Sequence, residues 1–182
     1  MIEFRKIENS FDPLFPTIYK LYKSAFPAIE RRNLGALEAI LNYEKRFEMD
    51  VLIKGEKSVG FFAYWTFERF VYVEHFAIDP NMRGHNIGSE TMKAFSQKTA
   101  YPIVLEVEMP KNAQSIRRVG FYERLNFKVL PHNYAQPYYD GSGQLLPMLV
   151  MSNDYHFADK HFGLIKNTLY ENVYKYFPEK NV

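Results

Sequence analysis

The chain has 182 residues, of which 47% are hydrophobic and 24% charged, a composition typical of a globular protein and unlike that of a disordered one. A formal net charge of +2 gives no support for nucleic-acid binding, and the lack of cysteine excludes disulfides, a thiol nucleophile and a thiolate metal site. The sequence has no run of about 18 apolar residues and no signal-peptide pattern, so we expect a cytoplasmic protein with no membrane partner.

The first half of the chain predicts two helices followed by a meander of strands. Apolar residues recur at helical spacing over 14–26 and again over 34–47, where Phe47 completes the apolar face. The sequence "DVLIKGEKSVGFFAYWTFERFVYVEHFAI" then predicts three antiparallel strands with turns near Gly55 and Glu68.

Helices and strands alternate in the second half. The pattern predicts a helix over 87–98, a strand over 101–109, a helix over 114–125 and a strand over 126–130. A loop rich in Pro, Gly and Asn (131–144) precedes a last strand over 145–151. Residues 155–177 predict one amphipathic helix with an apolar stripe formed by Phe157, His161, Leu164, Ile165, Leu169, Val173 and Phe177.

This order of elements indicates a mixed α/β (α+β) fold: a central, mostly antiparallel mixed sheet flanked by helices, with an extra C-terminal helix. We expect a single domain over 1–182, with a core at about 1–151 and a helical extension at about 152–182. Because four other helices already cover the sheet, the stripe of the extension is expected at a sheet edge or in a homodimer.

The segment "RGHNIGS", residues 83–89, lies where a predicted strand leads into a predicted helix. The first turn of a helix has unpaired N–H groups and partial positive charge, which together bind anions. Gly84 and Gly88 would let a phosphate approach the backbone, and Arg83 adds a permanently charged donor. A P-loop is excluded because Ser89 and Glu90 follow Gly88 in place of Lys and Ser or Thr, and a three-glycine dinucleotide motif is excluded by the glycine spacing. These residues alone leave a pyrophosphate site and an ordinary turn as alternatives.

With its flanks, "IDPNMRGHNIGSETMKAF" resembles the acyl-CoA-binding motif of the GNAT superfamily of N-acyltransferases. The family pattern is Arg or Gln, two residues, Gly or Ala, one residue, Gly or Ala, and it falls on Arg83, Asn86 and Gly88. Asn86 departs from it, but Asn tolerates the left-handed conformation. "VGFYERLNFKVL" resembles a later helix and strand of the family, with Asn126 where Gly is usual.

The resemblance covers about residues 1–151 and implies that backbone amides of this loop hold the coenzyme A pyrophosphate. It assigns acetyl-CoA as co-substrate, with no metal, and five histidines without ligand spacing agree with that. The residues that it places at the cofactor are Phe76, Ile78, Arg83, Gly84, His85, Asn86, Ile87, Gly88 and Ser89.

The catalytic residues implied by the resemblance are Tyr122 and a carboxylate. Tyr122 matches the tyrosine that points at the coenzyme sulfur as a general acid, and a core tyrosine is the alternative. Proton transfer from a free tyrosine to a thiolate is uphill by about 2 kcal/mol. A backbone amide near Ile78 is the implied donor to the thioester oxygen.

Three glutamates lie on the strands that the resemblance places around the thioester: Glu74, Glu106 and Glu108. Strand alternation predicts that Glu74 shares a face with Tyr72 and Phe76, where aromatic surroundings would raise its pKa and suit it to act as the base. Glu74 is the favoured candidate, and a surface charge or a water chain is the alternative.

The acceptor is expected at the least regular segments, "AFPAIERRN" and "NYAQPYYDGSG". Tyrosine offers a rigid apolar body with a polar tip, and a carboxylate attracts a cationic amine. The candidate acceptor-binding residues are Glu30, Tyr134, Gln136 and Tyr138.

The function implied is acetyl transfer from acetyl-CoA to a primary amine, with a small molecule as the favoured acceptor and with direct attack of the amine on the thioester. The alternatives are a protein or peptide N-acetyltransferase and a non-catalytic module that binds coenzyme A.

Overall fold

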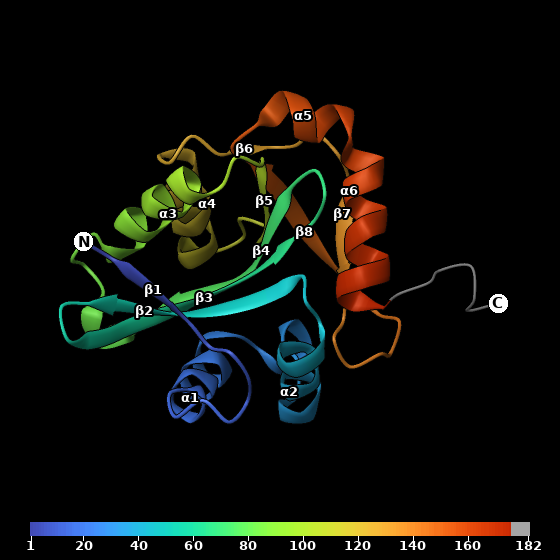
Figure 1. Cartoon of the computed structure of the whole chain (residues 1–182). Helices are drawn as coiled ribbons and strands as arrows, with labels where there is room; N and C mark the ends of the chain where they lie inside the picture. Colours follow the sequence, from blue (N-terminus) through green and yellow to red (C-terminus); the bar gives the residue numbers. More distant parts are fainter. Residues whose placement is uncertain (176–182) are drawn as a thin grey trace. The chain divides into compact units, whose positions relative to one another are not determined.

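The computed structural model describes residues 1–175 (Figure 1), and the chain divides between Ile103 and Val104 into two compact units. Each unit contains strands and flanking helices, and the strand pairings found within the units are antiparallel. The mixed α/β class and the mostly antiparallel strands are therefore confirmed. The single domain over 1–182 stays a prediction.

The first unit (residues 1–103) is a four-stranded meander in the order β1-β2-β3-β4. Figure 1 shows α1 and α2 on one face of these strands and α3 on the other. The elements are β1 (Glu3–Lys6), α1 (Phe15–Ala25), the 3₁₀ helix η1 (Ala28–Glu30), α2 (Leu34–Tyr43), β2 (Phe47–Lys54), β3 (Lys57–Thr66), β4 (Val71–Ile78), the 3₁₀ helix η2 (Pro80–Met82) and α3 (Ile87–Lys98).

Neighbouring phenylalanines of β3 define the two faces of the meander. The Phe61 ring meets Tyr22 of α1 with centroids 5.9 Å apart, and the Phe62 ring meets Phe95 of α3 at 4.4 Å. Strand alternation sends consecutive side chains to opposite faces, so both faces have an aromatic core.

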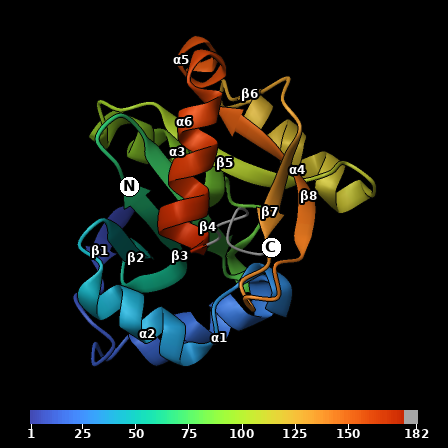
Figure 2. The same cartoon turned by 90° about the vertical axis from the view of Figure 1, so that its right-hand side faces the viewer.

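In the second unit (residues 104–182), β8 pairs with β5, β6 and β7. Figure 2 shows its C-terminal helices beside β7. The elements are β5 (Ile103–Glu108), α4 (Ala113–Glu123), β6 (Lys128–Val129), β7 (Tyr134–Pro137), β8 (Leu145–Ser152), α5 (Tyr155–Lys160), α6 (Phe162–Thr168) and the π-helix η3 (Leu169–Tyr174).

The predicted C-terminal helix over 155–177 is wrong in its continuity and in part of its stripe. It is divided into α5, α6 and η3, with a break at His161, and Leu164 is exposed. Residues 176–177, including Phe177 of the predicted stripe, lie outside the described part of the chain. Ile165, Leu169 and Val173 are buried in the monomer, so the apolar stripe no longer argues for a homodimer, which stays a prediction.

Three other differences have local causes. The helix over 34–47 ends at Tyr43, and Phe47 instead begins β2, where it pairs with Trp65. The short strand β1 is half-exposed and has too little alternation to be recognised. Strand β7 lies in the predicted loop 131–144, where Pro137 and the flanking Asn and Gly residues are typical of a loop and not of a strand.

Asp50 of β2 is a buried carboxylate whose pKa burial raises to about 6, with the nearby Glu48 charge adding to the effect. The unfolded chain titrates near pH 4. The folded state therefore binds more protons between about pH 4 and 6, and its free energy of unfolding falls as pH rises through that window.

We expect Asp50→Asn to raise the free energy of unfolding by about 1–3 kcal/mol at pH 7.5 and to change it little at pH 4. Urea titrations at the two pH values measure this. Glu48→Gln, at a more exposed neighbour, is the matched control and should have a smaller effect. An equal effect of Asp50→Asn at both pH values would contradict the assignment.

Candidate active site

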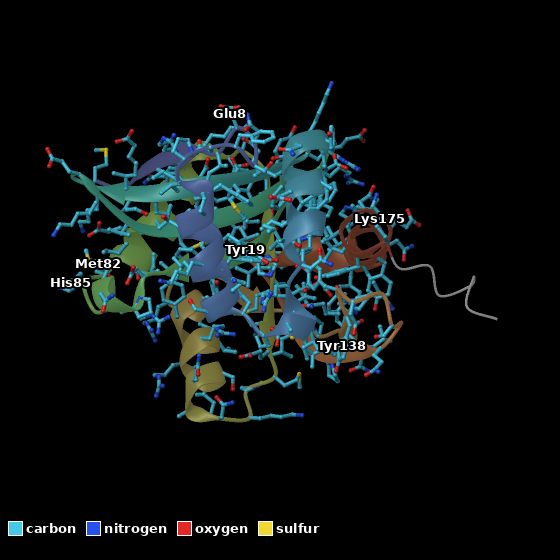
Figure 3. The ribbon with its side chains drawn as sticks, turned by 90° about the horizontal axis from the view of Figure 1, so that it is seen from below. Glu8, Tyr19, Met82, His85, Tyr138 and Lys175 are labelled. Atoms are coloured by element: carbon cyan, nitrogen blue, oxygen red, sulfur yellow. The ribbon has the colours of Figure 1, made fainter. Side chains whose placement is uncertain are left out.

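The loop between β4 and α3 follows one turn of 3₁₀ helix, and Asp79 caps that turn by accepting a hydrogen bond from the Asn81 N–H at 2.8 Å. Residues 83–86 are exposed. Figure 3 shows His85 and Met82 close together at the surface of this loop, and the His85 ring nitrogen lies 3.3 Å from the Met82 carbonyl. The cofactor candidates Arg83, Gly84, His85 and Asn86 are thus within reach of a ligand.

The backbone of this loop has the left-handed conformations that its sequence predicts. Gly84 has φ +83° and Asn86 has φ 59°, so Asn86 keeps the loop shape at the position where the family has Gly or Ala. Asn126, at the end of α4, has φ 66° and fulfils the same expectation.

Asn86 occupies the N-cap position of α3 but its side chain does not cap the helix. The same residue type at the start of α4, Asn112, is extended and accepts hydrogen bonds from the N–H groups of Gln114 and Ser115. The left-handed conformation of Asn86 thus leaves the first-turn amides of α3 without a side-chain acceptor. That arrangement suits a bound anion.

The start of α3 is held by the burial of Ile87 and by an ion pair of Glu90. The partly exposed Gly88 and Ser89 follow Ile87 in the first turn. Glu90 would repel an anion at this place, but its carboxylate pairs with the Lys54 ammonium of β2 at 2.8 Å. The hydrogen bond from Lys54 also lowers the pKa of Glu90.

The end of β4 is held very close to β3. Gly60 pairs with Ile78, and a Cβ built on Gly60 would lie 2.3 Å from the Ala77 carbonyl oxygen. Phe76 faces α3 and packs on Phe62, with centroids 5.2 Å apart. The cofactor candidates Phe76 and Ile78 therefore sit on a segment of backbone that cannot shift toward β3.

Glu74 differs from its predicted orientation. The β3–β4 register places Ala63 opposite His75 and Tyr64 opposite Val73, so Glu74 is the extra residue of a β-bulge. Its carboxylate accepts a hydrogen bond from the Trp65 indole at 2.8 Å, on the α1/α2 face, whereas Phe76 lies on the α3 face. The predicted common face of Glu74 and Phe76 is wrong because the bulge interrupts the alternation.

The Glu74 side chain is fully buried and forms an ion pair with Arg32. The guanidinium stabilises the carboxylate anion, and both carboxylate oxygens already accept hydrogen bonds. These contacts do not favour Glu74 as the group that takes a proton from a substrate amine.

Tyr122 lies in the last turn of α4 and is 8% exposed. Burial raises the pKa of its hydroxyl to about 12. Its ring packs edge-on against Phe121 and Phe127. Within residues 1–175 the hydroxyl makes no hydrogen bond, so it remains a donor for a ligand.

The four predicted acceptor residues are placed differently from one another. Glu30 ends η1, and its backbone carbonyl lies 2.8 Å from the His75 ring nitrogen. Tyr138 follows β7 and is partly exposed (Figure 3). Gln136 is 4% exposed, and its side-chain nitrogen is the one buried side-chain polar atom without a hydrogen-bond partner in the described part of the chain.

Tyr134 is hydrogen-bonded within its own unit. Its hydroxyl donates to one oxygen of Glu106, while the Tyr174 hydroxyl of the π-helix donates to the other at 2.6 Å. Burial and the Glu106 charge raise the pKa of Tyr134 well above its usual value. A second hydroxyl of the π-helix, from Tyr170, donates to the Ala135 carbonyl at 2.6 Å. The C-terminal segment therefore takes part in the organisation of β5 and β7.

Comparisons with known proteins agree with this geometry. Residues 46–129 match the family model described as an acetyltransferase (GNAT) domain. A structure from Bacteroides thetaiotaomicron, assigned as a GNAT-family acetyltransferase, is 32% identical, covers 94% of this chain and 98% of its own, and superposes with a TM-score of 0.89. The chain belongs to the GNAT family of acetyltransferases.

More distant GNAT proteins share the fold. A GNAT acetyltransferase from Elizabethkingia anophelis with acetyl-CoA bound is 11% identical, covers 83% of this chain and 96% of its own, and has a TM-score of 0.55. YjbC of Bacillus subtilis (strain 168), also assigned as an acetyltransferase, is 26% identical over 112 residues, or 60% of this chain. The match spans 56% of YjbC, little more than half of that curated relative.

This GNAT enzyme has three structural residues that the sequence motifs did not single out: Arg32, Gly60 and Tyr174. A signal existed only for Gly60, as a glycine inside a strand pattern, which often marks close backbone approach. Among residues 1–175, no cluster of His, Asp and Glu could hold a metal ion, and no helix is long and apolar enough to cross a membrane.

Proposed function

We propose that this GNAT acetyltransferase moves the acetyl group of acetyl-CoA to a primary amine of a small molecule. The observation that carries the proposal is the start of α3, where left-handed Gly84 and Asn86 leave first-turn amides without a side-chain cap behind an exposed Arg83. Such amides, with the helix dipole and a guanidinium, suit a pyrophosphate.

In the proposed reaction the neutral amine attacks the thioester carbon directly. The N–C bond forms and the C–S bond breaks. The amine gives one proton to water, and the coenzyme thiolate is protonated or hydrogen-bonded as it leaves. A backbone amide near Ile78 donates a hydrogen bond to the developing oxyanion, and Tyr122 donates a hydrogen bond to the departing sulfur.

Acceptor recognition is proposed for the face of β5 and β7 that carries Glu106, Tyr134 and Gln136. Glu106 pairs with Val150 and Tyr134 with Met148, two positions apart on β8, so their side chains share a face. The Glu106 carboxylate is partly exposed and would attract an ammonium group. Tyr138, which follows β7 in the same unit, is proposed to complete this face, and Glu30 of the first unit stays a predicted acceptor residue.

The test is thiol release from acetyl-CoA with a panel of alkylamines, amino sugars and amino acids, compared with peptides that carry a free N-terminus or a lysine. We expect turnover with at least one small amine and its N-acetyl product by mass spectrometry. Turnover with peptides alone would favour a peptide N-acetyltransferase. Acetyl-CoA binding without any turnover would favour a non-catalytic module.

Gln136→Leu is expected to raise KM for the acceptor about 10-fold and to leave KM for acetyl-CoA unchanged. The buried amide nitrogen lacks a partner, and a substrate oxygen that satisfies it would gain about 1–2 kcal/mol. Initial-rate kinetics with the best acceptor measure the effect.

Gln144→Leu, at an exposed glutamine of the same loop region, is the matched control and should leave KM unchanged. An unchanged acceptor KM in Gln136→Leu, together with higher thermal stability, would show that this nitrogen plays no part in binding.

A further inference from the structure

The β-bulge at Glu74 gives β4 two consecutive side chains on one face. The Glu74 carboxylate meets Trp65, and the His75 ring packs edge-on against Tyr22 of α1 with centroids 4.8 Å apart. Regular alternation would send one of these two residues to the α3 face. Both instead point toward the connection between α1 and α2.

These two side chains bind the α1–α2 connection, residues 26–33. The Arg32 guanidinium pairs with one oxygen of Glu74, whose other oxygen accepts from the Trp65 indole at 2.8 Å. A ring nitrogen of His75 donates to the Glu30 carbonyl at 2.8 Å. The Arg32 backbone N–H donates to the Tyr22 hydroxyl, also at 2.8 Å. We call Arg32, Glu74, His75 and Tyr22 the β4 clamp.

Stability alone is a poor reason for the ion pair at the centre of the β4 clamp. The Arg32 and Glu74 side chains are 7% and 0% exposed. Desolvation of two such charges largely offsets their attraction, so apolar residues of similar size often serve stability equally well. The pair does provide a specific geometry, because it fixes the bulge and the connection in one arrangement.

The same bulge lies three residues before Ala77, whose carbonyl is pressed against Gly60. Both ends of the segment 74–78 are therefore fixed, one by the β4 clamp and the other by close strand contact. Bulges commonly aim groups next to active sites.

We propose that Arg32 and Glu74 are a pair of positioning residues for acetyl transfer, and that Glu74 does not exchange a proton with the substrate. The inference rests on the proposed function, because the segment 74–78 supplies the amide proposed for the oxyanion. The pair fixes the position of that amide relative to the connection 26–33. Loss of either partner then misplaces both by a fraction of an ångström.

The test is a double-mutant cycle with Arg32→Gln, Glu74→Gln and the combined variant. We expect each single change to lower kcat about 10- to 100-fold, the cost of a small misplacement, with KM for acetyl-CoA unchanged. The combined variant should be no worse than the more impaired single one. Arg32→Lys, which keeps the charge but not the planar fork, should recover part of the loss.

The pH profile separates positioning from proton transfer. If Glu74 positions, the acidic limb of kcat/KM keeps its midpoint in Glu74→Gln. Loss of that limb in Glu74→Gln, with full activity in Arg32→Gln, would make Glu74 the base and overturn the proposal. Multiplying losses in the combined variant would also overturn it.

A fifth variant tests whether the loss of activity is caused simply by unfolding. Arg32→Met combined with Glu74→Leu replaces the pair with apolar side chains of similar size, and we expect it to fold while kcat stays low. Wild-type kcat in this variant would overturn the proposal.

Hydrogen exchange of the amides in 26–33 and 74–78 tests the β4 clamp without activity. Faster exchange is expected in the apolar double variant, and unchanged protection would contradict the clamp. A wild-type protein that transfers no acetyl group would defeat the proposed function, while the exchange result would still decide whether the pair holds these segments.

Discussion

Gly88→Val is expected to abolish the binding of acetyl-CoA. Gly88 is the second residue of α3, in the first turn that follows the left-handed Asn86. A branched side chain there would stand between the first-turn amides and a bound pyrophosphate. Loss of two amide contacts to a charged group would cost about 3–6 kcal/mol, so we expect affinity to fall at least about 100-fold.

Isothermal titration calorimetry with acetyl-CoA measures this loss. Replacing glycine with valine also changes helix propensity and backbone entropy, so a control must carry the same change in another helix. Gly163→Val in α6 is suitable because a Cβ built there meets nothing within 4 Å, and it should bind acetyl-CoA normally. Intact binding in Gly88→Val would refute the pyrophosphate assignment.

Tyr122→Phe is expected to lower kcat about 10- to 1,000-fold, the usual range for a group that assists proton transfer. The hydroxyl pKa of about 12 makes complete proton donation to a thiolate cost about 5 kcal/mol, more than the unburied residue would need. Tyr122 should therefore act chiefly as a hydrogen-bond donor to the sulfur. Because it stays protonated, it should produce no basic limb below about pH 10 in the profile of kcat.

Single-turnover measurements with the best acceptor isolate the chemical step from product release. Tyr101→Phe, at an exposed tyrosine, is the matched control and should change nothing. Acetyl-CoA affinity should also be preserved in Tyr122→Phe. A wild-type rate of chemistry in that variant would leave Tyr122 as a residue of the core.

Much of the fold could be predicted because its strands are long and apolar. The runs that form β2, β3 and β4 are separated by turns marked by Gly55 and by Glu68-Arg69. Helix α3 begins after a loop with left-handed residues and a family motif. Strand β7 could not be predicted, because its four residues pair only with β8 and carry a proline.

The coenzyme loop was the predictable part of the candidate site, since its function depends on local backbone conformation that Gly84 and Asn86 reveal in sequence. The role of Glu74 was not predictable in the same way. A bulge depends on how β4 pairs with β3, and the sequence does not show that one residue of β4 lacks an opposite partner. Similarly, nothing in "ERRN" tells which of Arg31 and Arg32 is buried.

Trp65 is the single tryptophan of the chain, and it lies inside the β4 clamp. Its indole N–H is bonded to Glu74, its ring is 1% exposed, and the Arg32 guanidinium carbon lies 5.9 Å from the ring centroid. An indole between two opposite charges shifts its emission when either charge moves. The protein thus carries an intrinsic fluorophore where the Arg32–Glu74 pair joins β4 to the α1–α2 connection, and its emission would report changes in that contact without an added label.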